Sequence, residues 1–366
     1  RDVAPSRGLG DVYKRQRYRW LLIYLLGGTG TVHETYIEDC VRQLEEVGEG
    51  GFSNEGALSY RNSECGYTNK HELFPSYNSV EEYVSSLEQF IKEGLIESPR
   101  ELYSQIRLKA KDNYNIMDSL IEEGINYLEY RSIDINPFDK AGISLEDLEF
   151  INIFNLFLLI EDESNYEIWQ EEALENQKTI SRYGQNKVTL KKDGKPIDKE
   201  EWGIEILEKI KKINEELSLE KEDILNKMIE KIKDYKLTYA YKIIEKVKEE
   251  GYVKAHLNLA KSYKEDAYRN RFKLEGYEDL ELSTQILMKE SIKRGITVDL
   301  VDRSDNFISL TQGDKIEYVK QATKTSKDNY VTVLMMENKV VTKDILRKNN
   351  IKVPKGCLLY TSDAAD

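Results

Sequence analysis

Apolar residues recur every three or four positions in the early part of the chain. In residues 79–94 this spacing gives one helix face, made by Val80, Tyr83, Val84, Leu87 and Phe90. Ser79 with Glu82 three residues later is typical of a helix start, and Gly94 of a helix end. A capped amphipathic helix is therefore predicted here.

Other early segments give helical or extended patterns. Residues 17–26 and 34–47 repeat the helical spacing. Three segments read as strands: ALSYRN at 57–62, ELYSQIRLKA at 101–110 and YLEYRSIDINPF at 127–138. Proline disfavours both helix and strand pairing, so Asn136-Pro137 ends the last of them.

From Ser144 the pattern is helical for more than a hundred residues. Ser144 and Asp147 form a second capping pair. The Lys/Glu-rich stretch 200–250 carries isoleucines at helical spacing. Its charged residues are most simply interpreted as the solvent-exposed face of a helix. A non-enzymatic helical scaffold is one interpretation of this region.

The pattern changes again near residue 281. A helix over 283–295 is followed by three strand-like segments, at 297–302, 307–312 and 315–323, and by a helix starting at Thr342. Such mixing is typical of a second α/β or α+β unit, with a boundary near 280. The fold class predicted for the whole chain is α+β.

Composition and charge limit the classes of function that fit this chain. The 366 residues include 67 acidic and 54 basic side chains, a net charge of −13, which disfavours a nucleic-acid partner. The longest apolar runs are too short to span a membrane. Cys40, Cys65 and Cys357 lie at wide, irregular spacing, which favours free thiols in a reducing, cytoplasmic compartment.

Candidate chemistry lies in the segment 127–138. In a strand, Glu129 and Arg131 share one face about 6.7 Å apart, too far for a tight ion pair, while Leu128 and Tyr130 face a core. A carboxylate suits Mg²⁺ and a guanidinium suits phosphate, so together they describe half of a Mg-ATP site. The alternative is that each pairs with a cross-strand partner on a solvated sheet face.

Four segments resemble the glutamate-cysteine ligase family and follow one another in the same order as in that family. They are RYRWLLIYLLGG, ALSYRNSECGYTNK, ELYSQIRLKAK and YLEYRSIDINPF. The stretch from LELSTQILMKESIKRG to VPKG resembles the start of an ATP-grasp module. A ligase portion followed by such a module is similar to bacterial bifunctional glutamate-cysteine ligase/glutathione synthetases. An ATP-grasp ligase of the cyanophycin-synthetase type is a rival interpretation.

The resemblance implies a reaction and a set of residues. ATP would phosphorylate the γ-carboxylate of glutamate, and cysteine would then displace the phosphate, with Mg²⁺ or alternatively Mn²⁺ as the metal. Glu129 would bind this metal, and Arg131 would contact the transferred phosphate. Residues of the cysteine substrate site would be Arg61, Tyr67 and Tyr103, with Arg107 on the phosphate side. Glycine as a further substrate and a homodimer are left open.

The resemblance also implies a layout. Residues 17–280 match the C-terminal portion of the ligase domain and 281–356 the beginning of the ATP-grasp module, with 1–16 and 357–366 as non-native flanks. The family's first carboxylate-bearing strands have no counterpart before Arg17. We therefore expect this chain alone to hold neither a complete ligase site nor a complete synthetase site.

Overall fold

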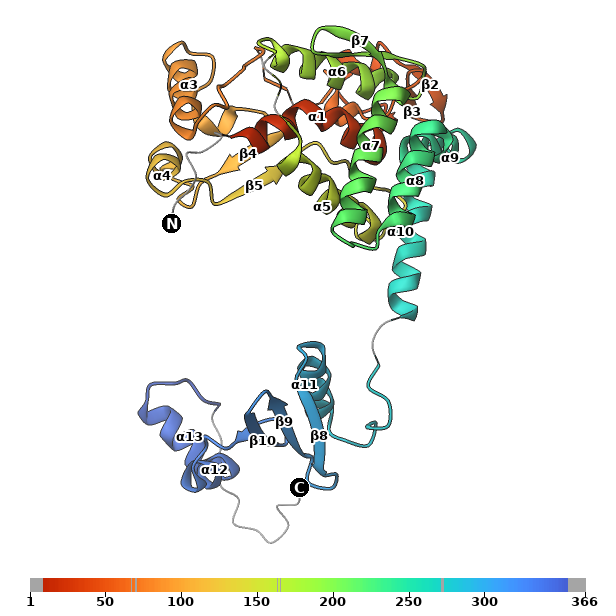
Figure 1. The fold of residues 1–366 in the computed structure, drawn as a ribbon. Coiled ribbons are helices and arrows are strands. Elements are labelled where there is room, and N and C mark those ends of the chain that lie inside the picture. Colours follow the sequence, from red (N-terminus) through yellow and green to blue (C-terminus); the bar gives the residue numbers. More distant parts are fainter. Residues whose placement is uncertain are drawn as a thin grey trace. The chain divides into compact units, whose positions relative to one another are not determined.

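The computed structural model describes residues 9–354, apart from 67, 70, 163, 165, 271 and 272. The chain divides into two compact units, and the division falls between Asp266 and Ala267. Figure 1 colours the chain from red at the N-terminus to blue at the C-terminus. Within the described residues, no helix is both long enough and apolar enough to cross a membrane.

Helix α1 (Gly10–Leu26) runs through the core of the first unit. Trp20, Leu21 and Ile23 are fully buried, because α5 (Leu145–Ile160) and α6 (Trp169–Tyr183) pack against α1. A helix covered on all sides has no purely polar face. It begins at Gly10 and not at Arg17, so the predicted start was wrong.

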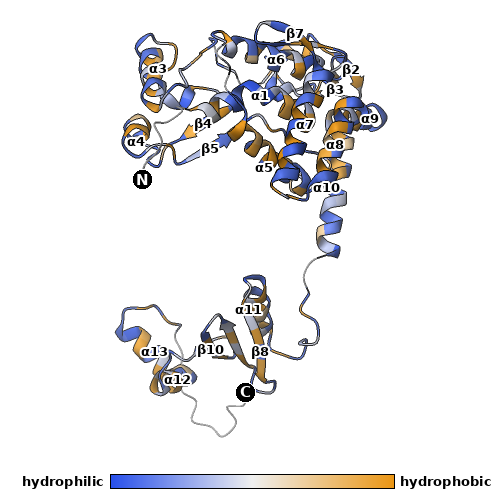
Figure 2. Cartoon of the chain, viewed as in Figure 1, coloured by the Kyte–Doolittle hydropathy of each residue, from blue (hydrophilic) through white to orange (hydrophobic). Residues whose placement is uncertain are grey.

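The remaining helices of this unit surround α1 or the sheets. They are α2 (Glu38–Val41), α3 (Val80–Lys92), α4 (Ile116–Glu123), α7 (Lys199–Glu216), α8 (Glu222–Lys233), α9 (Tyr239–Glu250) and α10 (Tyr252–Arg269), with 3₁₀ turns η1 (Tyr60–Asn62), η2 (Pro99–Glu101) and η3 (Tyr235–Leu237). Figure 2 shows hydrophobic and hydrophilic residues mixed along α7 and α8, as expected for half-buried helices.

Both predicted caps are confirmed. The Ser79 hydroxyl accepts a hydrogen bond from the backbone N–H of Glu82 at 3.1 Å, at the start of α3. Ser144 and Asp147 form a reciprocal capping box at the start of α5. The Lys/Glu-rich region forms α7, α8 and α9, as its pattern predicted.

Among its described residues, the first unit contains three small antiparallel sheets. Strands β1 (Val32–His33), β2 (Glu45–Gly48) and β3 (Gly51–Ser53) lie in the order β1-β3-β2, while β4 (Ile106–Lys109) pairs with β5 (Tyr127–Tyr130), and β6 (Thr189–Lys192) with β7 (Lys195–Asp198). Figure 1 shows the β4–β5 pair near α3 and α4, whose side chains share its core.

Two early predictions were wrong. Residues 34–47 form only the short α2 before β2 begins. Helix α9 packs closely on this strand, since a Cβ at Gly48 would lie 2.2 Å from the Val247 carbonyl oxygen. ALSYRN is not a strand: it contains η1 and a single bridge from Ser59 to Thr29. The segments at 101–110 and 127–138 do form strands, β4 and β5, but shorter ones than predicted.

The helical region after Ser144 is interrupted by the β6–β7 hairpin. Its turn residues Asp193 and Gly194 have φ of 53° and 74°. Both values are positive, as a two-residue Asp-Gly hairpin turn requires. The sequence analysis predicted a continuous helical pattern here and missed the hairpin, for which this dipeptide was the available sequence signal.

The second unit combines α11 (Leu282–Lys293), a sheet in the order β11-β10-β9-β8, and two further helices. Its strands and last helices are β8 (Thr297–Asp302), β9 (Phe307–Gln312), β10 (Lys315–Lys320), β11 (Lys324–Thr325), α12 (Tyr330–Glu337) and α13 (Lys339–Lys348). The predicted strands are confirmed, but the last helix begins at Lys339, capped by Asn338, and not at Thr342.

Candidate functional site

The β4–β5 pair displays charged side chains on one face and apolar ones on the other. Ile106 and Leu108 are buried, and Leu128 and Tyr130 pack on the same cores. Arg107 lies directly opposite Glu129 in the register, so the two share the second face. The predicted alternation along residues 127–130 is confirmed.

Glu129 meets two cations on this face. Its carboxylate lies 3.3 Å from Lys109 Nζ and 3.7 Å from Arg131 Nε. The Arg131 contact is loose, in keeping with the expectation that these two residues form no tight ion pair. Glu129 and Arg131 are 36% and 28% exposed, so these pairs are weak and replaceable by a ligand.

Two further predicted residues join Arg131. The Nε of Arg61 donates to the carbonyl oxygen of Arg131 at 3.1 Å, and the Arg131 guanidinium lies over the Tyr103 ring, 5.6 Å from its centroid. The backbone of Tyr103 is held on both sides by the Asn69 amide, at 2.8 and 3.0 Å. Asn69, from the GYTNK segment, therefore reaches the site. Tyr67 itself lies outside the described residues.

Arg107 has a different environment. Its guanidinium donates to the carbonyl oxygen of Arg100. Both arginines and Lys109 line a cavity of about 460 Å³ beside the sheet. The structure thus brings Arg61, Tyr103, Glu129 and Arg131 into one chain of contacts, and leaves Arg107 on the same face in a neighbouring basic cavity.

The sequence analysis missed Asp134, a carboxylate that is 3% exposed. It accepts hydrogen bonds from the backbone N–H groups of Gly28 and Thr29, both at 2.9 Å. It also accepts from the side chains of Thr29 and Ser59, at 2.6 and 3.1 Å. Burial raises the pKa of Asp134, and these donors oppose that rise.

Asp134 belongs to a buried set of contacts that we call the interlock: Asp134, Thr29, Ser59, Asn62 and the Ser132 carbonyl. Asn62 Nδ2 donates to the Ser132 carbonyl oxygen at 2.8 Å and lies 3.4 Å from Asp134 Oδ1. Since Asn62 follows Arg61 and Ser132 follows Arg131, the interlock fixes the two arginines relative to each other. An Asp among apolar neighbours was the only sequence feature that pointed to it.

The cysteines also differ from expectation. Cys40 and Cys65 form a disulfide with their Cα atoms 5.7 Å apart, so the prediction of free thiols was wrong for this pair. Arg182 Nη1 lies 3.3 Å from Cys65 Sγ, and the Tyr36 hydroxyl donates to the Cys65 carbonyl oxygen at 2.8 Å. The disulfide thus anchors the segment that follows Arg61. Cys357 lies outside the described residues.

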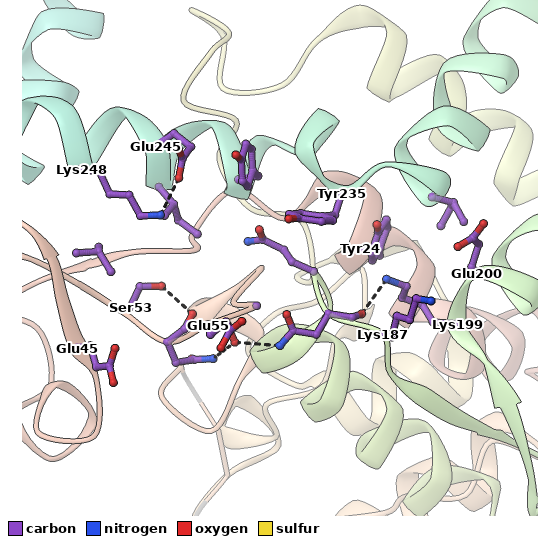
Figure 3. A pocket seen from close by; sticks show the side chains of 18 of the residues that line it. Tyr24, Glu45, Ser53, Glu55, Lys187, Lys199, Glu200, Tyr235, Glu245 and Lys248 are labelled. Atoms are coloured by element: carbon purple, nitrogen blue, oxygen red, sulfur yellow. Dashed lines mark hydrogen bonds and ion pairs between the residues drawn. The ribbon is translucent and has the colours of Figure 1, made fainter.

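A cavity of about 750 Å³ lies elsewhere in the first unit. Figure 3 shows its wall, with Lys248 paired to Glu245 and Lys199 donating to the Asn186 backbone. None of the predicted site residues that the structure describes lines it. A smaller cavity of about 300 Å³ does include Tyr103, so size alone does not locate the candidate site.

Across the part of the chain that the structure describes, no three His, Cys, Asp or Glu side chains gather closely enough to hold a metal by themselves. Glu129 offers a single carboxylate. Mg²⁺ usually keeps several waters and takes one or two carboxylates plus substrate phosphates, so one half-exposed carboxylate fits a metal that arrives with a nucleotide.

Comparisons with known proteins show which families the chain matches. Residues 8–97 and 89–180 match the glutamate-cysteine ligase family, and residues 278–331 match an ATP-grasp-like domain. The first unit therefore carries a region of the glutamate-cysteine ligase family, and the second an ATP-grasp-like segment.

Two named relatives match nearly the whole of this chain. The glutathione biosynthesis bifunctional proteins GshAB of Clostridium perfringens and of Listeria monocytogenes EGD-e are 44% and 45% identical over 94% and 92% of this chain. The chain spans 46% and 44% of their lengths.

Solved structures give the same picture. The crystal structure of a bifunctional glutathione synthetase from Pasteurella multocida has a TM-score of 0.65 and 31% identity, over 97% of this chain and 46% of that one. The glutamate–cysteine ligase of Francisella tularensis in complex with AMP also has a TM-score of 0.65, over 73% of this chain and 59% of that one, and at 23% identity it supports the fold alone.

Proposed function

We propose that the charged face of β4 and β5 is part of the site that joins the γ-carboxylate of L-glutamate to the amine of L-cysteine at the expense of ATP. The observation that carries this proposal is the contact chain Arg61–Arg131–Tyr103 beside Glu129. A scaffold would not need a partly exposed carboxylate beside an arginine whose guanidinium lies over a tyrosine ring and whose backbone carbonyl accepts a hydrogen bond from a second arginine.

The reaction has two balanced steps. In the first, a γ-carboxylate oxygen of glutamate attacks the terminal phosphorus of ATP, and ADP leaves as γ-glutamyl phosphate forms. In the second, the cysteine amine attacks the acyl carbon, phosphate leaves, and the amine proton passes to solvent or phosphate. Both steps move negative charge, so preorganised cations lower the barrier more than a covalent nucleophile would.

Each residue has a role that its contacts support. Arg131, fixed through its carbonyl and its ring contact, would hold the transferred phosphate, and Arg107 would hold neighbouring phosphate oxygens from the basic cavity. Arg61 and Tyr103, with Tyr67, would bind cysteine. Glu129 would bind Mg²⁺, or alternatively Mn²⁺, which would neutralise charge on the nucleotide phosphates.

The relatives are about twice as long as this chain, so the complete reaction, with glycine addition by the ATP-grasp portion, is proposed for a protein of that length. The test uses such a protein, L-glutamate labelled with ¹⁸O in the γ-carboxylate, L-cysteine, ATP and Mg²⁺. One ¹⁸O per turnover should appear in inorganic phosphate, and γ-glutamylcysteine should form. Product without label transfer would contradict the acyl phosphate, and no cysteine-dependent product would contradict the proposal.

A further inference from the structure

Lys231 is a buried lysine of α8 whose amine is only partly engaged. The residue is 9% exposed, and its Nζ lies 3.3 Å from the Leu25 carbonyl oxygen and 4.0 Å from the centre of the Tyr239 ring. Within the described part of the chain, no carboxylate lies at ion-pair distance from this Nζ. A buried ammonium group that lacks a counter-charge is costly, which favours the uncharged amine.

The charge state of this amine follows from its surroundings. Burial lowers the pKa of Lys231 to about 8; the nearby Asp147 opposes the fall, and the nearby Lys242 adds to it. At pH 7 about one-tenth of the amine is therefore uncharged, compared with less than about one-thousandth for a lysine that titrates near 10.4. An uncharged amine is a nucleophile, so Lys231 can react where most lysines cannot.

Lys199 on α7 shows that burial alone does not free a lysine. It is 7% exposed, burial lowers its pKa as well, and its Nζ lies 4.7 Å from the centre of the Tyr24 ring. However, this Nζ donates to the carbonyl oxygens of Gly184 and Asn186, at 2.8 and 3.2 Å (Figure 3). Two acceptors hold its protons, whereas Lys231 has one long contact with an acceptor. Lys231 is therefore the more available amine.

Lys231 lines a cavity of about 540 Å³ whose wall is formed by α5, α8, η3 and α9. The two carboxylates that α5 contributes are already engaged. Glu146 pairs with Lys227 at 2.5 Å, and Asp147 accepts a hydrogen bond from the Tyr239 hydroxyl at 2.9 Å. A small molecule can therefore reach the surroundings of Lys231 without displacing an ion pair of that lysine.

The other charged groups at this cavity come from α8 and α9. Glu230 pairs with Lys233 at 3.4 Å, and Asp223 lies exposed in the first turn of α8, where a carboxylate suits the helix N-terminus. Lys242 of α9 is exposed, and among the described residues it has no ion-pair partner. Lys242 is thus available to a negative charge that forms on Lys231.

We propose that Lys231 is a carbon dioxide site, at which the amine forms a carbamate whose negative charge is balanced by Lys242. The lone pair of the amine attacks the carbon of CO₂, a C–N bond forms, the electrons of one C=O π bond move to oxygen, and one amine proton passes to water. The step needs no oxidant and has no leaving group. The carbamate nitrogen keeps one N–H, which can still donate to the Leu25 carbonyl oxygen.

CO₂ fits this cavity better than an anionic electrophile does. It is small and uncharged, so it can reach an amine that is 9% exposed. An acyl phosphate would instead meet the carboxylates of Glu146, Asp147, Asp223 and Glu230 and be repelled. The inference goes beyond the proposed function and does not rest on it, because none of the described residues of the proposed site lines this cavity.

The test is carbamate trapping with the chain in ¹³C-labelled bicarbonate near pH 8, the pKa of Lys231, where both CO₂ and uncharged amine are present. A trialkyloxonium salt converts each carbamate to a stable ester, and peptide mapping by mass spectrometry locates it. We expect the labelled ester on Lys231 and not on Lys199. Lys231→Arg keeps the cation and should carry no ester, and circular dichroism checks that this variant is folded.

Lys242→Met removes the proposed partner of the carbamate. The carbamate fraction on Lys231 should fall about two- to fivefold, as expected for the loss of one exposed ion pair. Lys248→Met is the matched control, because Lys248 lies on the same helix, pairs with Glu245 and does not line this cavity. The carbamate fraction in Lys248→Met should equal that of the wild type.

Cyanate gives an independent measure of amine reactivity. Isocyanic acid has the size and shape of CO₂ and carbamoylates uncharged amines irreversibly. Labelling of Lys231 should be about tenfold or more faster than labelling of Lys199, because Lys199 must first give up hydrogen bonds from a charged donor. Added bicarbonate should slow the labelling of Lys231 and leave that of Lys199 unchanged.

Three results would each overturn the inference: no trapped ester on Lys231, an equal carbamate fraction in Lys242→Met and Lys248→Met, or equal cyanate labelling of Lys231 and Lys199. None of the three depends on a substitution of Lys231 itself, so they decide the matter even if Lys231→Arg does not fold.

Discussion

Arg61 donates a hydrogen bond from its Nε to the carbonyl oxygen of Arg131 at 3.1 Å, across 70 residues of sequence. Next to this contact, Asn62 bonds the Ser132 carbonyl oxygen and approaches Asp134. The two segments that carry the arginines are therefore held in register by the Arg61 guanidinium, by the neutral Asn62 amide and by one buried carboxylate.

Asp134→Asn should disturb that register. An amide has one oxygen where the carboxylate has two, so its NH2 group would face the donors of one set, either Gly28 and Thr29 or Ser59 and Asn62, at a cost of about 1–3 kcal/mol in the free energy of unfolding. Because Arg61 and Arg131 then lose their fixed spacing, we expect the KM for cysteine to rise about tenfold while kcat changes less. Steady-state kinetics with varied cysteine, together with denaturant unfolding, measure both effects.

The matched control for this variant is Asp147→Asn. Asp147 is also buried, at 2% exposure, but its carboxylate serves the cap of α5 and the Tyr239 hydroxyl. It should lose comparable stability with an unchanged KM. Equal KM values in both Asn variants would mean that the interlock supports the fold and does not position the arginines.

The Tyr103 ring supports the Arg131 guanidinium. A cation–π contact of this kind contributes about 0.5–2 kcal/mol, so Tyr103→Leu should reduce kcat/KM about fivefold. Tyr103→Phe keeps the ring and should stay within about twofold of wild type. If Phe were as impaired as Leu, the phenol hydroxyl and not the ring would be the functional group.

The Cys40–Cys65 disulfide closes a loop with a sequence separation of 25. In the chain-entropy account a loop of this length contributes about 3 kcal/mol to stability. Reduction should therefore lower the denaturation midpoint, while a Cys40→Ser/Cys65→Ser double variant should be insensitive to reductant. Mass spectrometry after thiol alkylation checks the bond itself, and labelling of both cysteines in the unreduced protein would contradict it.

Lys231 gives a pH dependence. Burial lowers its pKa to about 8, and its Nζ contacts the Leu25 carbonyl oxygen and the Tyr239 ring. An unfolded lysine titrates near 10.4, so above pH 8 the unfolded state holds a proton that the folded state has released. The contribution of Lys231 to stability therefore rises with pH from about 8 to 10, by about 2 kcal/mol. Lys231→Met should lack this rise in urea unfolding curves, and an unchanged slope in that variant would contradict it.

The features that sequence reasoning found are local. Caps such as Ser79 with Glu82 act across one helical turn, and the alternation of residues 127–130 acts across one strand. The missed feature depends on partners far along the chain, because Asp134 meets donors more than 70 residues away. The 34–47 prediction failed because the helical spacing of its apolar residues also suits a short helix followed by a strand that packs on α9.

The most direct test of the central claim is the rate of γ-glutamylcysteine formation by Glu129→Gln, in a protein of the relatives' length. Its control is Glu123→Gln, which removes an exposed carboxylate paired with Lys111 nearby in sequence. We predict a loss of about 100-fold or more for Glu129→Gln, with unfolding free energy within about 1 kcal/mol of wild type, and an unchanged rate for Glu123→Gln. A wild-type rate in the folded Glu129→Gln protein would contradict the account.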